Sequence, residues 1–134
     1  MESTRPLEIA HVLFMDIVSY STLPIDQQSE AIKHLQDIVR NLPEFERATR
    51  SDQLISLSTG DGMALAFFED LTAPLRCARD IALNLKTNAL FQVRMGIHTG
   101  PVYRIDDINA NRNLAGGGIN FAQRVMDCGI AATF

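Results

Sequence analysis

Two aspartates in this chain lie where strands are expected to end. Asp16 follows four consecutive apolar residues, and Asp61 lies between Gly60 and Gly62 in the sequence Ser-Thr-Gly-Asp-Gly. An unpaired carboxylate directly behind an apolar strand is costly to bury, so Asp16 requires a partner or a metal ion. Magnesium takes oxygen ligands and keeps several waters, so that one or two carboxylates and substrate phosphates suffice to bind it. The two acids therefore point to divalent-metal chemistry on a polyphosphate.

A third polar group follows a run of glycines near the C-terminal end. Asn120 and Arg124 lie four residues apart, so a helix would project them from one face. An amide and a guanidinium are groups that can stabilise a phosphoryl transition state. Each piece alone has an ordinary alternative: Asp61 as a turn residue, the glycines as a flexible loop, and the Asn–Arg pair as a solvated helix face. Their joint occurrence favours nucleotide chemistry.

Composition excludes several other classes of protein. The chain of 134 residues fits one domain, with 46% hydrophobic and 21% charged residues. The net charge is −4 and the twelve Lys and Arg are scattered, so we expect no nucleic-acid partner. The apolar runs are too short to cross a bilayer and no signal core follows the N-terminus, so we expect a cytoplasmic protein without membrane contact. The two cysteines and three histidines lack zinc-ligand spacing, which favours reduced thiols.

Hydrophobic periodicity predicts an α+β fold, a ferredoxin-like α/β sandwich in which helices pack on a mainly antiparallel sheet. Residues 1–10 form a tail and residues 11–134 form the domain. The predicted strands are 11–17, 53–58, 63–68, 91–97 and 102–105. The predicted helices run from an Asp26 cap to Pro43, from an Asp70 or Thr72 cap to Leu85, and from residue 119 to 126. A turn is expected at residues 98–101 and a polar loop at residues 106–112.

The second predicted helix has an apolar stripe that should face the sheet. Its expected inner positions are Leu71, Leu75, Ala78, Ala82 and Leu85, with Ile81 beside them.

Together with the stretch Val93 to Val102, these motifs resemble the catalytic domain of class III adenylate and guanylate (nucleotidyl) cyclases of the bacterial type. Four motifs occur in the family's order, and the resemblance runs from about Val12 to Gly129. It implies an enzyme that converts a nucleoside triphosphate to a 3′,5′-cyclic monophosphate and pyrophosphate. It also implies two Mg²⁺ or Mn²⁺ ions in a site shared between two cyclase domains, and so a homodimer.

The resemblance assigns the metal and phosphate ligands by position. Asp16 and Asp61 match the two metal-binding aspartates, and the backbone carbonyl of Ile17 would complete one shell. Ser21 matches the hydroxyl that, with the backbone of residues 18–21, holds the terminal phosphates. Arg94 matches an arginine that binds the same phosphates.

The resemblance also assigns the residues around the ribose and the base. Asn120 and Arg124 match the pair that orients the ribose and stabilises the α-phosphate, which in this family comes from the opposite subunit. Leu57 and Asn113 occupy the positions that read adenine in adenylyl members through a lysine and an aspartate. Leucine offers no hydrogen bond and an amide can face several base edges. ATP is the favoured substrate, while GTP and the pyrimidine triphosphates stay open.

The chain ends earlier than the family pattern, which continues after Met126 to Gly129 into strands that complete the sheet. Either the sequence is a fragment or the expected domain is incomplete at its C-terminus. One alternative is a cyclase-like module that binds nucleotide or dimerises without turnover, which Leu57 and the short C-terminus favour. Another is an unrelated metal-dependent phosphotransferase.

Overall fold

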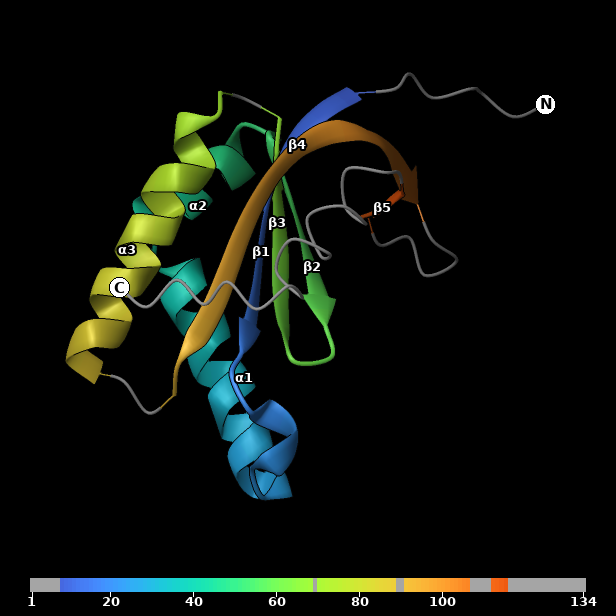
Figure 1. Ribbon diagram of the computed structural model, residues 1–134. Helices are drawn as coiled ribbons and strands as arrows, with labels where there is room; N and C mark the ends of the chain where they lie inside the picture. The colour runs from blue at the N-terminus through green and yellow to red at the C-terminus, as the bar shows by residue number, and fades with distance from the viewer. Residues whose placement is uncertain (1–7, 69, 89–90, 107–111, 116–134) are drawn as a thin grey trace.

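The computed structural model describes residues 8–68, 70–88, 91–106 and 112–115. Within these residues the helices pack on one face of an antiparallel sheet with the strand order β2-β3-β1-β4-β5 (Figure 1). The elements are β1 (Glu8–Ile17), the 3-10 helix η1 (Tyr20–Thr22), α1 (Ile25–Arg40), α2 (Pro43–Arg50), β2 (Leu54–Thr59), β3 (Gly62–Phe67), α3 (Thr72–Asn88), β4 (Val93–Asp106) and β5 (Arg112–Ala115). The predicted α+β arrangement, a ferredoxin-like sandwich, is confirmed.

Strand β1 is the centre of the sheet and is buried on both faces. Its odd-numbered residues Leu13, Met15 and Ile17 lie in the core beneath the helices. The alternate residues Val12 and Phe14 belong to a second apolar cluster on the opposite face. A strand covered on both sides reads as a continuous apolar run, which is why this strand was recognisable in the sequence.

Helix α1 packs on the sheet through Ala31, Leu35 and Val39, as its periodicity predicted. It begins at Ile25, so Asp26 lies in its first turn and is not its cap. The helix ends at Arg40, before Pro43.

Pro43 begins the short helix α2, in whose first turn a proline has no backbone hydrogen bond to lose. This helix was not predicted, because the sequence of residues 43–50 has only one buried position, Ala48.

Helix α3 has the predicted cap, and its inner face is the predicted one at Ala82 and Leu85 but not at its start. The Asp70 carboxylate accepts hydrogen bonds from the backbone N–H groups of Thr72 and Ala73, at 3.1 and 3.2 Å. The predicted inner residues Leu71 and Leu75 are instead 46% and 51% exposed. The buried face is formed by Ala73, Cys77, Ile81, Ala82 and Leu85. Small residues at the start of this stripe let the helix lie close to the sheet, whereas Leu71 and Leu75 are partly exposed to solvent.

Strand β4 runs without interruption through residues 98–101, so the predicted turn there is wrong. All ten residues of β1 pair with β4, from Glu8 opposite Val102 to Ile17 opposite Val93. Within the described residues, β5 pairs with β4 only from Tyr103 to Asp106, so the missing N–H of Pro101 interrupts no ladder with it.

The remaining predictions concern the chain ends and loops. Strand β5 was not predicted, and residues 8–10 belong to β1 and not to a tail. The predicted helix at 119–126 and most of the loop at 106–112 lie outside the described residues. In the described part of the chain, none of the helices combines the length and the apolar character needed to cross a membrane.

Candidate functional site

The end of β1 and the turn between β2 and β3 lie side by side (Figure 1). The backbone N–H of Ile17 donates to the carbonyl oxygen of Asp61 at 2.9 Å. In the ladder between β1 and β3, Asp16 pairs with Gly62. The backbones of two aspartates that lie far apart in the sequence are thus close together at one end of the sheet, and their role in metal binding stays a prediction.

Gly62 makes this close approach possible. A Cβ atom at this position would lie 1.9 Å from the carbonyl oxygen of Met15 and 2.7 Å from the Cα of Asp16. At Gly60, by contrast, a Cβ atom would meet nothing within 4 Å. The Gly-Asp-Gly sequence predicts the turn but not which glycine the packing needs, because that depends on β1.

Asp16 is paired with Arg94 across the ladder between β1 and β4. Arg94 Nε donates to Asp16 Oδ1 at 2.9 Å, and Arg94 Nη2 donates to Oδ2 at 2.7 Å. The carboxylate side chain is 3% exposed and the guanidinium side chain 28%. Two parallel hydrogen bonds of this kind are among the stronger contacts between side chains. The partner that the sequence required for Asp16 is therefore, in this structure, Arg94.

The chemistry of the donor set fits a hard divalent cation only when further ligands are added. Asp16, Asp61 and the Ile17 carbonyl would offer oxygen atoms, which suit Mg²⁺ and Mn²⁺. Among the described residues no group of three or more His, Cys, Asp and Glu side chains could hold a metal. A metal at this end of the sheet would thus depend on oxygen atoms from substrate phosphates and water.

The predicted phosphate-binding turn follows directly after β1. Ser21 lies in η1 and is exposed. Ser19 has a left-handed backbone with φ of 58°, which turns the chain sharply away from the sheet. The N–H of Val18 donates to the carbonyl oxygen of Gln92 at 2.9 Å, so this amide is engaged within the protein. Phosphate binding by the rest of the turn stays a prediction.

The two predicted base-reading positions lie on different strands. Leu57 of β2 is half-buried and packs against the same apolar cluster that contains Phe14, on the face of the sheet to which Asp16 points. Asn113 pairs with Ile105 in the ladder between β4 and β5. Asn120 and Arg124 lie outside the described residues.

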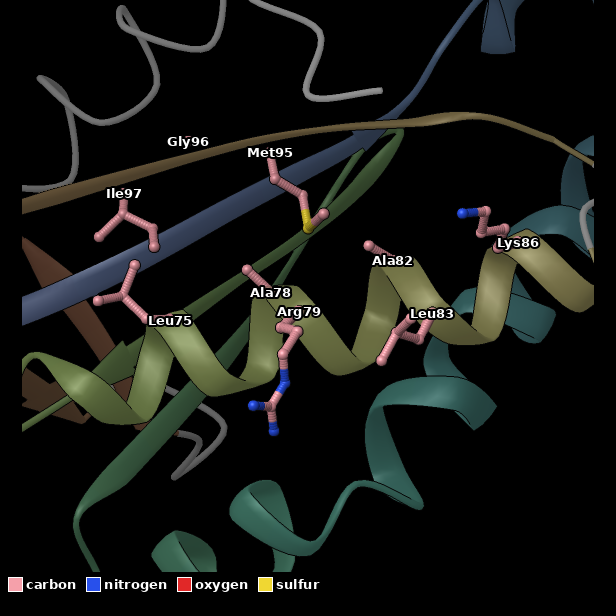
Figure 2. Close-up of a pocket in the computed structure, with 9 residues that line it drawn as sticks. All are labelled: Leu75, Ala78, Arg79, Ala82, Leu83, Lys86, Met95, Gly96 and Ile97. Atoms are coloured by element: carbon pink, nitrogen blue, oxygen red, sulfur yellow. The ribbon is translucent and has the colours of Figure 1, made fainter. Parts of the chain in front are cut away.

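A groove of about 670 Å³ lies on the other face of the sheet, between α3 and β4 (Figure 2). Met95 and Ile97 project into it from β4 and Leu75 from α3. Because side chains alternate along a strand, Met95 points away from the face that carries Arg94 and Asp16. The described residues that line the groove include no acidic side chain, and neither Asp16 nor Asp61 is among them.

No family model matches the sequence, and no curated protein matches it either. Solved structures, however, share its architecture. A bacterial light-regulated adenylyl cyclase matches 92% of this chain and 71% of its own, with a TM-score of 0.71 and 18% identity. The chain has the fold of adenylyl and guanylyl cyclase catalytic domains.

Two further cyclase structures agree. The catalytic core of a rhodopsin-guanylyl cyclase with converted specificity, solved with ATPαS, matches 94% of this chain and 76% of its own, with a TM-score of 0.67 and 20% identity. An adenylate/guanylate cyclase/hydrolase from Silicibacter pomeroyi matches 93% and 73%, with a TM-score of 0.64 and 22% identity. At these identities the likeness is one of fold.

Proposed function

We propose that this domain is a nucleotidyl cyclase that converts a nucleoside triphosphate to a 3′,5′-cyclic nucleotide and pyrophosphate. One observation carries the proposal: in a cyclase fold, the backbone of Asp61 is hydrogen-bonded to Ile17, immediately beside Asp16. A structural ion pair would explain Asp16 alone, but it gives no reason for a second aspartate at the same end of the sheet.

The reaction is an in-line displacement at the α-phosphorus. The ribose 3′ oxygen forms a bond to this phosphorus while the bond to the bridging oxygen of the β-phosphate breaks. Pyrophosphate leaves with that oxygen, and the hydroxyl proton passes to water. When bound, two Mg²⁺ or Mn²⁺ ions supply activation of the attacking oxygen and stabilisation of the leaving one.

The chain's own residues position the reactants. Asp16, Asp61 and the Ile17 carbonyl would hold the cations, while Ser21 and Arg94 would bind the terminal phosphates. Asn120 and Arg124, from a second copy of the chain, would orient the ribose and stabilise charge on the α-phosphate. The proposal thus includes a homodimer with two sites at its interface, in the cytoplasm where nucleoside triphosphates are made.

The base is assigned less narrowly than the reaction. ATP is the favoured substrate, and Leu57 and Asn113 would lie against the base. Incubating the purified protein with each of the four nucleoside triphosphates and Mn²⁺, and identifying products by mass, tests both points. A cyclic monophosphate from at least one of them is the expected result.

Substitution of the acids tests the mechanism. Asp61→Asn and Asp61→Ala should abolish Mn²⁺-dependent cyclisation while the protein stays folded, as should Asp16→Ala at some cost in stability. Asp37→Asn removes an exposed carboxylate on α1, whose side chain is 53% exposed, and should leave the rate unchanged. Retained turnover in the Asp61 variants would refute the metal assignment.

The shared site can be tested by mixing inactive variants. Arg124→Ala should lower the rate by about 10²–10³-fold, the scale of one lost electrostatic contact. If Asp61 and Arg124 act from opposite subunits, an equal mixture of the Asp61→Asn and Arg124→Ala proteins contains dimers with one intact site. Such a mixture should recover about a quarter of the wild-type activity, as expected for random pairing in a symmetric dimer. No recovery would place both residues in one subunit's site.

A second candidate is a cyclase-like module that binds nucleotide or dimerises without turnover. The fork between Arg94 and Asp16 favours it, because this carboxylate already has a full-charge partner. Nucleotide binding without a cyclic product from any of the four triphosphates would select this candidate over the enzyme.

A further inference from the structure

The Asp16 carboxylate has both of its oxygens engaged by one guanidinium. Arg94 reaches them through Nε at 2.9 Å and Nη2 at 2.7 Å. The acid is almost fully buried, whereas more than a quarter of the Arg94 side chain is exposed. The guanidinium is therefore accessible to a solvent-borne anion, while the carboxylate is buried near the end of β1.

A divalent cation and the guanidinium compete for this carboxylate. Ionised carboxylate oxygens keep lone pairs beyond those used by the fork, so coordination of a metal is not blocked by valence. The obstacle is electrostatic, because a metal ion on these oxygens would lie a few ångströms from a positive charge with little water between them. In the absence of another anion, the Arg94 guanidinium already occupies the cation position on the Asp16 carboxylate.

We propose that Arg94 acts as an internal cation on Asp16, and that a divalent ion gains this carboxylate only when a polyphosphate draws the guanidinium away. The inference deepens the proposed function and rests on its assignment of Asp16 as a metal ligand. Phosphate oxygens accept the same two-pronged hydrogen bonding as a carboxylate, so Arg94 exchanges one anion for another of similar geometry. Metal and polyphosphate then bind together, and the metal alone binds weakly.

A purely structural ion pair is the competing explanation. It would join β1 to β4, but these strands are already paired along all ten residues of β1. Register therefore does not depend on this one contact. A structural role predicts that removing Arg94 changes stability and leaves metal affinity as it was, whereas an internal cation predicts that metal affinity rises.

The test measures Mn²⁺ binding in the absence of any nucleotide, from the electron paramagnetic resonance signal of the free ion. Wild-type protein, Arg94→Gln and Arg94→Lys are compared. Arg76→Gln serves as the control, because Arg76 also pairs with a carboxylate, Glu44, but does so between α3 and α2. Arg94→Gln should bind Mn²⁺ about tenfold more tightly or better, on the scale of a lost charge-assisted hydrogen-bonded pair. The control should bind as the wild type does.

A lysine variant keeps the experiment decisive if Arg94→Gln does not fold. Arg94→Lys preserves the charge but replaces the planar fork with a single ammonium, so its Mn²⁺ affinity should fall between the other two. Adding Asp16→Asn to either variant should remove the gain. The inference would be overturned if the wild type and Arg94→Lys bound Mn²⁺ with equal affinity. It would also be overturned if the wild type bound Mn²⁺ tightly in the absence of nucleotide.

These measurements involve no turnover. They can succeed in a protein that makes no cyclic product, and they can fail in one that does, so the outcome is separable from that of the cyclisation assay.

Discussion

Replacement of Gly62 by alanine should destabilise the contact between β1 and β3 on which the candidate site is built. The added Cβ would lie 1.9 Å from the Met15 carbonyl oxygen, and real contacts of this kind essentially never fall below 3.0 Å. Strands β1 and β3 would have to separate by roughly 1 Å or more to relieve the overlap. The atoms that clash belong to the backbone, so no side chain can rotate away.

The cost has two parts. Overpacking in a close-packed region costs about 1–3 kcal/mol. The separation also stretches backbone hydrogen bonds such as that from Ile17 N–H to the Asp61 carbonyl, each worth about 1 kcal/mol net. We expect the free energy of unfolding of Gly62→Ala to fall by about 3 kcal/mol, which lowers the melting temperature by roughly 10 °C in a domain of this size.

Gly60→Ala is the matched control. Neither glycine has a left-handed φ, so the φ of both positions is open to alanine and the two sites differ in the space around the Cβ atom. Open surroundings at Gly60 predict a change within about 1 kcal/mol, with a small gain from the less flexible unfolded chain. Urea and thermal unfolding followed by circular dichroism measure both variants. Equal stability of the two would refute the argument from close approach.

Three other predictions concern α3 and its neighbours. Burial tends to raise the pKa of Glu44, but the hydrogen bonds and positive charges of Arg76 and Arg47 together outweigh it and hold this pKa below the usual 4.5. Glu44→Gln should therefore lower the free energy of unfolding, measured with urea, by its full amount above about pH 4.5. This difference from the wild type should disappear as the pH falls through the lower folded-state pKa. Burial raises the pKa of Cys77 to about 12, so iodoacetamide at pH 8 should label its peptide in urea but barely in native protein, as read by mass spectrometry. Leu85→Ala should lower the free energy of unfolding by about 2–4 kcal/mol and Leu83→Ala by less than about 1 kcal/mol. The reason is that these two side chains of α3 are 8% and 56% exposed. Equal losses would mean that the groove face is covered.

Local patterns predicted most elements but not how far each one extends. The apolar run before Asp16 identified β1, and the Gly-Asp-Gly sequence identified the hairpin of β2 and β3, because strand burial and turn geometry act over a few residues. The residues at 98–101, His-Thr-Gly-Pro, indicated a turn that β1 overrides by pairing along the whole segment. The inner face of α3 was misjudged at Leu75 for a similar reason, since the sheet beneath it selects the smaller side chains.

The sequence by itself determined that two carboxylates follow strands or lie in tight turns and that one of them requires a positive partner. Only the tertiary structure decided which partner. Asp16 and Arg94 are separated by most of the domain and meet because the register of β1 and β4 sets them opposite each other. The register of β1 and β3, together with the small size of Gly62, brings Asp61 to the end of β1. Such meetings depend on the sum of many weak long-range contacts, which no short stretch of sequence contains.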